Sequence, residues 1–304
     1  MNLDKLMDSL NFAFRQKDAV YRIFDLAKGL FRGGFSFKRI VSSFLIIAEL
    51  FGSLLFDTPV KPYGQELDLT GYEIVFEDEF NGDALDADKW EARGNGPRRY
   101  GYNASSQIEV KDGSMLIKGE YLEDGQYGAG WYVGAVHLKE RYVRGYYEIR
   151  CKCNAGKEFW SAFWLQHGNA YVHDKSQGGV HGAEIDIFES LTMNKKEKNG
   201  VSTTIHCNGW DDDVEHIDSR LLGKFKGNNI TEEYNTYGLK WTEDEYIFYI
   251  NGVETCRSSF GNGVSTEPEE VIVSLEIPDL VTYEHDFATQ MQVDYVKIYQ
   301  LSAD

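Results

Sequence analysis

Short stretches of alternating apolar and polar residues, separated by turn signals, run from Tyr72 to the end of this 304-residue chain. One of them, residues 245–250, leads directly into Asn251-Gly252, which is among the strongest hairpin signals in a sequence. Many short strands with turns between them favour an antiparallel sandwich or a barrel. The aromatic content of 14% and the 30 glycines against 5 prolines agree with an all-β domain rich in turns.

The first 65 residues differ from the rest of the chain in both charge and pattern. Residues 1–40 carry 8 Lys and Arg against 4 Asp and Glu, whereas the remaining chain carries 23 against 45. Apolar residues recur at three- and four-residue intervals up to Phe31, which is typical of amphipathic helices. We therefore predict a helical N-terminal extension and linker over residues 1–65 and a β-sandwich domain over residues 66–304.

Residues 40–56 are nearly all apolar, and they leave three interpretations of the extension open. The run has 17 residues and contains Glu49, which makes it short and costly as a membrane span. Lys38 and Arg39 precede it as in a signal peptide, but no small-x-small cleavage site follows. Residues 1–56 are therefore a helical segment docked on the domain, a membrane-surface or anchoring segment, or an unconventional export signal.

The most informative stretch for function is EIDIFE, residues 184–189, which is typical of a β-strand. Because side chains on a strand alternate between faces, Glu184 and Asp186 point the same way, whereas Glu189 lies at an odd spacing. A β-bulge at residues 187–188 would return Glu189 to the acidic face. Retaining glycoside hydrolysis needs two close carboxylates whose pKa values differ, and crowding of like charges produces that difference. On spacing alone, a solvated acidic face or a cation site are the alternatives.

The segments around this strand resemble glycoside hydrolase family 16. GKEFWSAFWLQ precedes the strand and TTIHCNG follows it, and VFEDEFNG, GYYEIRCK, YNTYGLKW and VDYVKIYQ occur in the family's order, over about residues 72–300. The six-residue form resembles the bulged branch, which includes laminarinase-like and agarase-like enzymes. The resemblance implies a concanavalin-like jelly roll of two antiparallel sheets with a sugar cleft on the concave one. It also implies that Glu184 is the nucleophile, Asp186 its assisting carboxylate and Glu189 the general acid/base.

Candidate sugar-binding residues lie in the same segments. Side chains along a strand alternate between its two faces (the period-two rule), so Trp160 and Trp164 of WSAFWL lie on one face. With the resemblance, we expect Trp160 in the cleft and Trp164 mainly in the core. His206 matches a cleft position of the family, where it would hydrogen-bond the sugar or the acid/base carboxylate; a purely structural role is the alternative. Three further residues in Gly-rich or polar loops are candidates for gripping the substrate: Trp131, Arg98 and Trp210.

The chemistry implied by the resemblance requires no cofactor. The sequence contains no C-x-x-C or Cys/His zinc spacing and no Gly-rich phosphate loop, and its four cysteines look like small buried residues. Many members of the family hold a structural calcium, and Asp294 matches one ligand position. Calcium needs six or more oxygen ligands, so Asp294 alone is weak support for a structural calcium.

These observations favour an endo-acting retaining hydrolase of a β-linked polysaccharide, with β-1,3- or mixed-linked glucan first and galactan second. A transglycosylase and a non-catalytic glycan-binding module on the same fold are the alternatives. The formal charge of −18 argues against a nucleic-acid partner, which requires a basic face. We expect a monomer whose partner is the polysaccharide, with residues 1–56 as the candidate membrane contact. A polymeric substrate favours an extracellular or membrane-associated location, although no clear cleavable signal peptide is present.

Overall fold

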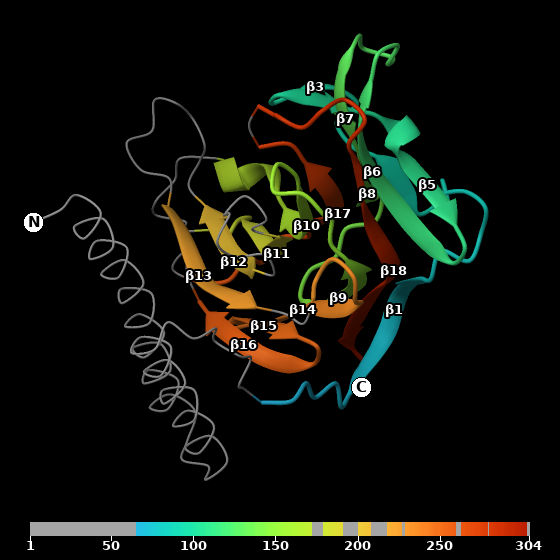
Figure 1. Ribbon diagram of the computed structural model, residues 1–304. Coiled ribbons are helices and arrows are strands. Elements are labelled where there is room, and N and C mark those ends of the chain that lie inside the picture. Colours follow the sequence, from blue (N-terminus) through green and yellow to red (C-terminus); the bar gives the residue numbers. More distant parts are fainter. Residues whose placement is uncertain are drawn as a thin grey trace, which may run out of the picture.

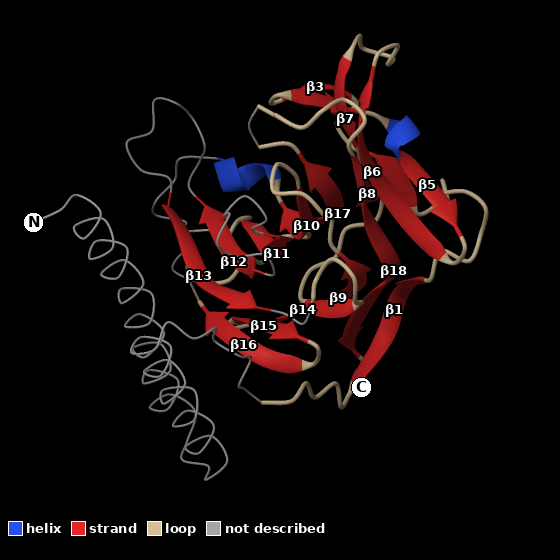
Figure 2. Ribbon diagram, viewed as in Figure 1, coloured by secondary structure: helices blue, strands red, loops and turns tan. Residues whose placement is uncertain are grey.

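The computed structural model describes residues 65–171, 179–190, 200–207, 218–226, 229–259, 263–278 and 280–302. These residues form two sheets of mainly antiparallel strands, which confirms the predicted all-β sandwich (Figures 1 and 2). The predicted helical extension over residues 1–56, with its membrane contact, and Trp210 lie outside the described residues. Within the described ranges, no helix is both long and apolar enough to traverse a bilayer. The domain boundary near residue 66 stays a prediction.

Among the described residues, the larger sheet has 11 strands. Its main path runs β16-β15-β14-β9-β18-β6-β7-β4-β3, with β1 beside β18 and β5 beside β6, and only the β4–β7 pairing is parallel. The bounds are β1 (Tyr72–Asp78), β3 (Gly96–Arg98), β4 (Gly101–Asn103), β5 (Ile108–Lys111), β6 (Ser114–Leu122), β7 (Gly130–Val133), β9 (Gly145–Lys152), β14 (Asn235–Trp241), β15 (Tyr246–Ile250), β16 (Val253–Ser258) and β18 (Ala288–Leu301).

The smaller sheet has seven described strands in the order β13-β12-β11-β10-β17-β8-β2. Figure 1 shows β12, β11, β10 and β17 side by side at its centre. The bounds are β2 (Trp90–Ala92), β8 (Ala135–Leu138), β10 (Trp160–Gln166), β11 (Glu184–Ser190), β12 (Gly200–Cys207), β13 (Asp218–Lys226) and β17 (Glu270–Glu276). Two short 3-10 helices, η1 (Ser105–Gln107) and η2 (Gly168–Tyr171), lie in the connections.

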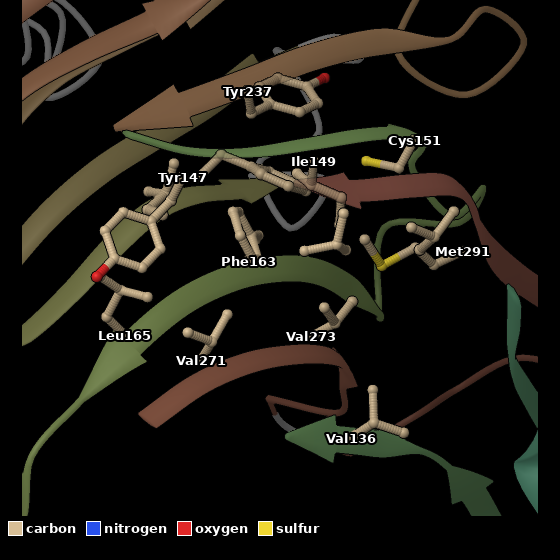
Figure 3. Packing of buried hydrophobic residues seen from close by; sticks show 14 of the residues in the cluster. Val136, Tyr147, Ile149, Cys151, Phe163, Leu165, Tyr237, Val271, Val273 and Met291 are labelled. Atoms are coloured by element: carbon tan, nitrogen blue, oxygen red, sulfur yellow. The ribbon is translucent and has the colours of Figure 1, made fainter. Parts of the chain in front are cut away.

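The alternation of side chains along β10 gives the smaller sheet two different apolar faces. Phe163 and Leu165 point between the sheets, where they join Tyr147 and Ile149 of β9 in the main core (Figure 3). All four side chains are fully buried. Burial of each such side chain contributes about 1.5–3 kcal/mol, so this layer holds the two sheets together.

The other face of β10 carries a second, separate apolar cluster. It consists of Trp160, Ala162 and Trp164 together with Ile272 of β17. Most of these side chains border a groove on the outer side of the smaller sheet. Two tryptophans on the outer face of a sheet are unusual for a purely structural surface, and they mark where the functional site lies.

A glutamate is buried inside the main core, at the start of β17. Glu269 is fully buried, and its Oε1 accepts hydrogen bonds from the backbone N–H of Ala183 (3.2 Å) and from Ser265 Oγ (2.7 Å). Its other oxygen, Oε2, has no hydrogen-bond partner among the described residues. Burial raises the pKa of Glu269 to about 8, so this side chain is neutral at neutral pH and ties the start of β11 to β17.

Replacing Glu269 with glutamine is expected to make the protein more stable at alkaline pH. Because the pKa of Glu269 is raised from 4.5 to about 8 in the folded state, the native protein binds this proton more tightly than the unfolded chain does. The Glu269 contribution to the free energy of unfolding therefore falls as pH rises through this window, by on the order of 4 kcal/mol. Glutamine keeps the accepting oxygen and cannot ionise, so the variant escapes this loss.

Urea unfolding of the wild type and the Glu269→Gln variant at pH 5, 7 and 9 measures the difference directly. Other carboxyl groups titrate in both proteins, so the gap between the two curves is the readout. A Glu267→Gln variant, which changes a neighbouring and more exposed carboxyl, serves as the control. Parallel stability curves for wild type and Glu269→Gln would contradict the prediction.

Candidate active site

The predicted β-bulge is present in the central strand β11. Asp186 lies opposite Thr204 of β12 and Glu189 lies opposite Ser202, so that the two residues 187–188 face a single residue of β12. The pairing with β10 shifts at the same point. The bulge places Glu189 on the outer face with Glu184 and Asp186, where all three border the groove. The predicted bulge at residues 187–188 and the predicted common face of the three carboxyl groups are confirmed.

Apolar packing explains why the chain bulges at this point. Ile187 and Phe188 are both buried in the main core, although a regular strand would turn one of them outward. The Phe188 ring stacks on Tyr237 of β14 with 4.0 Å between ring centroids. The hydroxyl of Thr203 donates a hydrogen bond to the carbonyl of Ile187 (3.1 Å), which pairs a backbone group that the bulge would otherwise leave unpaired.

The carboxyl groups of β11 are held by polar side chains of the two neighbouring strands. Gln166 of β10 donates from Nε2 to Glu184 Oε2 at 2.7 Å. From β12, His206 places Nε2 3.2 Å from Asp186 Oδ2 and 4.0 Å from Glu184 Oε1. His206 therefore lies beside the carboxyl groups of Glu184 and Asp186, the position that the family resemblance implied. Whether it contacts a sugar stays a prediction.

The surroundings shift the pKa values of three of these groups. Burial, together with the negative charges of Asp186 and Glu184, raises the pKa of Glu189 to about 8, although His206 and a hydrogen bond from Trp160 partly oppose the rise. Burial and the charge of Glu184 raise the pKa of Asp186 well above its usual value. Burial lowers the pKa of His206. The site therefore holds Glu189 protonated at neutral pH, as a general acid requires.

Both tryptophans of β10 line the groove, which corrects one expectation. Trp160 lies in the groove as predicted. Trp164 also lines the groove, on the outer face of the sheet, and does not lie in the core between the sheets. The guanidinium of Arg93 covers the Trp164 ring at 4.9 Å, and the Trp164 indole N–H donates to Ser274 Oγ at 3.1 Å. Trp164 is well buried because neighbours on the outer face cover it.

The structure places Arg98 in the groove but Trp131 elsewhere. Arg98, on the hairpin formed by β3 and β4, donates from Nε and from an NH2 group to the two oxygens of Glu276, both at 2.9 Å. Trp131 of β7 belongs to the main core, with its ring 5.6 Å from that of Phe159 and 5.5 Å from that of Tyr121. The prediction that Trp131 grips the substrate is therefore wrong, because β7 turns this ring inward.

In the described part of the chain, no cluster of His, Cys, Asp and Glu side chains with metal-binding geometry includes Asp294. Asp294 in β18 forms an ion pair with Arg150 of β9. Among the described residues, the one cluster of His, Cys, Asp and Glu with metal-binding geometry is Glu184, Asp186 and His206, whose ligand atoms lie within 4.8 Å of one another. A structural calcium at Asp294 stays a prediction. The four cysteines are free thiols, three of them buried.

Four charged or amide-bearing residues of the groove were not identified from the sequence: Arg93, Arg99, Gln166 and Glu276. Two of them could have been found by extending the period-two rule. Gln166 follows Trp160 and Trp164 on the same face of β10, and Glu276 follows Ser274 on the same face of β17. The two arginines come from connections after β2 and β3, and a sequence contains no signal for their approach to β10.

The structure therefore combines an antiparallel sandwich with a groove lined by carboxyl groups and tryptophans, an arrangement typical of jelly-roll proteins that act on carbohydrates. A family model described as the GH16 domain of β-porphyranases A–D matches residues 74–301. The chain therefore belongs to glycoside hydrolase family 16, as its sequence motifs predicted.

Curated relatives include enzymes with different named substrates. The chain is 24% identical to a glucan endo-1,3-beta-glucosidase A1 of Niallia circulans, over 80% of this chain and 39% of the relative. It is 27% identical to a beta-porphyranase B of Zobellia galactanivorans, over 58% of this chain and 64% of the relative. The chain spans less than two fifths of the length of several curated glycanases that it matches.

Solved structures share the fold. A non-specific endo-beta-1,3(4)-glucanase of family GH16, SCLam, superposes with a TM-score of 0.63 at 22% identity, covering 80% of this chain and 96% of that one. LamAcat of Zobellia galactanivorans superposes with a TM-score of 0.60 at 19% identity, covering 75% and 97%. At these identities the structures support the jelly-roll fold, and the activity must be argued from the site.

Proposed function

We propose that this protein is an endo-acting retaining glycoside hydrolase that cleaves a β-linked polysaccharide. The observation that carries the proposal is the bulged strand β11, which gathers Glu184, Asp186 and Glu189 at one groove and keeps Glu189 protonated at neutral pH. Family membership and the named activities of the glucanase and porphyranase relatives support the same reaction class.

Each carboxyl group has a distinct role in the proposed reaction. Glu189 donates its proton to the glycosidic oxygen while Glu184 attacks the anomeric carbon, so that the C–O bond to the leaving sugar breaks and a glycosyl-enzyme ester forms. The ionised Glu189 then takes a proton from water, which attacks the anomeric carbon and releases Glu184. Asp186 lies beside Glu184, and burial together with the charge of Glu184 raises the pKa of Asp186 well above its usual value. Gln166 donates a hydrogen bond to Glu184 and so orients the attacking carboxylate.

β-1,3- or mixed-linked glucans are the first candidate substrates and galactans the second. The named relatives include glucanases as well as a porphyranase and a keratan-sulfate endo-1,4-beta-galactosidase. Transglycosylation is a second candidate activity, because a sugar hydroxyl can replace water at the glycosyl-enzyme. The chain is 32% identical over 146 residues to a xyloglucan endotransglucosylase/hydrolase of Arabidopsis thaliana, covering 47% of this chain and 44% of that protein.

The proposal is tested by incubating the protein with a panel of β-glucans and β-galactans and measuring reducing-end release. We expect intermediate oligosaccharides from the start of the reaction, as an endo-acting enzyme produces, and a newly formed β-anomer by NMR, as a retaining enzyme produces. If a short β-linked oligosaccharide is used as substrate instead of a polymer, products longer than this oligosaccharide would identify transglycosylation. Binding to a polymer without release of reducing ends from any of them would instead favour the non-catalytic glycan-binding module.

A further inference from the structure

A rigid hairpin carries two arginines to the groove. Strands β3 and β4 pair with each other, and β4 pairs with β7 of the larger sheet. The Tyr102 ring of β4 stacks on Tyr132 of β7 with 4.9 Å between centroids. Gly101 lies so close to β7 that an added Cβ would be 2.6 Å from the Trp131 carbonyl oxygen. The larger sheet therefore fixes the base of this hairpin.

The tip of the same hairpin is tied to the smaller sheet. The double hydrogen bond from Arg98 to Glu276 joins it to β17, where Glu276 pairs with Trp160 of β10. Glu276 is almost fully buried, and a bidentate arginine is the geometry that best compensates a buried carboxylate. Arg98 is thus an anchor that holds the hairpin tip over the groove.

Arg99, the next residue, has a backbone conformation that favours glycine. Its φ of +53° lies in the left-handed region, which a side chain such as arginine adopts only at a cost in free energy. Its guanidinium lies over the Trp160 ring at 5.0 Å and 3.9 Å from Glu276, whose two oxygens already accept from Arg98. The side chain remains 45% exposed, so its charge is available on the groove side.

Arg99 stands next to the reacting centre. The Trp160 ring that it covers also hydrogen-bonds Glu189, the proposed general acid/base. A sugar ring that approaches Trp160 from this side therefore meets a guanidinium as well as an aromatic face. A neutral sugar would have to displace the arginine or leave it without a new partner, whereas an acidic substituent would pair with it.

The opposite end of the groove repeats the same combination. Arg93 covers Trp164, and Arg93 and Arg141 both lie near the single carboxylate of Glu270, at 3.3 and 4.0 Å. Guanidinium groups therefore outnumber the structural glutamates that face them at the groove. The groove is lined by Arg93, Arg98 and Arg99 as well as by acidic residues, and a guanidinium over each tryptophan places positive charge where an anionic group of a ligand can pair with it.

We propose that Arg99, held against Trp160 by the β3–β4 hairpin, binds an acidic substituent of the polysaccharide, a sulfate ester or a carboxylate, beside the cleaved bond. The proposal rests on the proposed function and narrows its substrate class to acidic polysaccharides. Both substituents offer oxygens that a guanidinium recognises through two parallel N–H donors. The strained backbone of Arg99 is then the cost of placing this group where the substrate needs it.

The test compares one polymer backbone with and without charge. A β-1,3-glucan and a β-galactan are each prepared as the neutral, the sulfated and the carboxymethylated polymer. Binding is measured by affinity electrophoresis with the full chain carrying Glu184→Gln, so that the polymers stay intact, and turnover is measured with Glu184 present. Binding remains measurable even if no polymer is cleaved, so failure of this proposal is distinguishable from failure of the proposed hydrolase activity.

Two substitutions of Arg99 and one matched control complete the design. Arg99→Gln removes the charge, and Arg99→Gly removes the charge and also relieves the backbone strain at φ +53°, so the two variants separate the effect of the charge from that of the backbone. Arg144→Gln is the control, because Arg144 also has a positive φ, +57°, and pairs with the exposed Glu243 rather than with a groove residue. Thermal melting of each variant checks its fold.

We expect at least one acidic polymer to bind more tightly than its neutral form. Either Arg99 variant should weaken that binding about 10- to 100-fold, as for a lost hydrogen bond to a charged group, and leave the neutral polymer within about threefold. Preference for sulfated over carboxymethylated polymer, or the reverse, identifies the substituent. Equal binding of charged and neutral polymers, no binding to any acidic polymer, or the same loss in Arg144→Gln would overturn the proposal.

Discussion

Replacing Glu184 with alanine is expected to abolish turnover of every polysaccharide that the wild type cleaves, and azide is expected to restore cleavage with the opposite anomeric outcome. The loss should be on the order of 10⁴-fold or more, because no other group can form the glycosyl-enzyme ester. The shortened side chain leaves room for azide to attack the anomeric carbon directly, from the face that Glu184 occupied. The product is then an α-glycosyl azide, in contrast to the β-configured product of the wild type.

The anomeric configuration of the azide product separates a lost nucleophile from a damaged fold. It is read by NMR with a short oligosaccharide that bears an activated leaving group. Glu184→Gln is the companion variant, since it keeps the shape of the side chain and its contact with Gln166 and should still bind substrate. A β-glycosyl azide from Glu184→Ala, or full turnover by Glu184→Gln, would refute the assignment of Glu184 as nucleophile.

Replacing Glu189 with alanine is expected to remove an alkaline limb near pH 8 from the pH profile of kcat/KM. In the wild type Glu189 must be protonated to donate to the leaving oxygen, so activity should fall as pH rises through its pKa of about 8. Without this acid, cleavage of a natural linkage should drop by about 10²–10⁴-fold. A substrate whose aryl leaving group departs without a proton should lose far less in the bond-breaking step.

The same variant has its own azide signature. In Glu189→Ala the nucleophile remains, so azide attacks the glycosyl-enzyme in place of water and gives a β-glycosyl azide. The pair of variants should therefore yield opposite anomers from the same substrate. A pH profile of Glu189→Ala that keeps the wild-type alkaline limb would show that another group supplies the proton.

The period-two rule explains how much of the site could be predicted from the sequence. It grouped Glu184 with Asp186, and the odd spacing of Glu189 then required the bulge that the structure contains at residues 187–188. The same rule placed Trp160 and Trp164 together. It states which side chains share a face, but it does not state which face another layer covers, and this is why Trp164 was misplaced.

Residues that reach the groove from distant connections could not be predicted in the same way. Arg93 and Arg99 lie about 60 to 90 residues before the two strands, β10 with its tryptophans and β11 with its carboxyl groups, that they approach. Their positions depend on the order β10-β17-β8-β2 and on the packing of the β3–β4 hairpin against β7. Trp131 was misassigned for a related reason, because a glycine-rich neighbourhood suggested an exposed loop where the chain forms a strand of the larger sheet.

The bulge in β11 also affects how this domain can change in length. Losing one residue from a regular strand turns every later side chain to the opposite face, which usually destroys a site. In β11 the loss of Ile187 would instead restore plain alternation, with Glu184, Asp186 and Glu189 still directed at the groove. The damage would be limited to one buried side chain and to the hydrogen bond from Thr203. At residues 187–188 the strand can lose one residue and keep its three carboxyl groups on one face, whereas a deletion at residue 185 would turn Asp186 to the opposite face from Glu184.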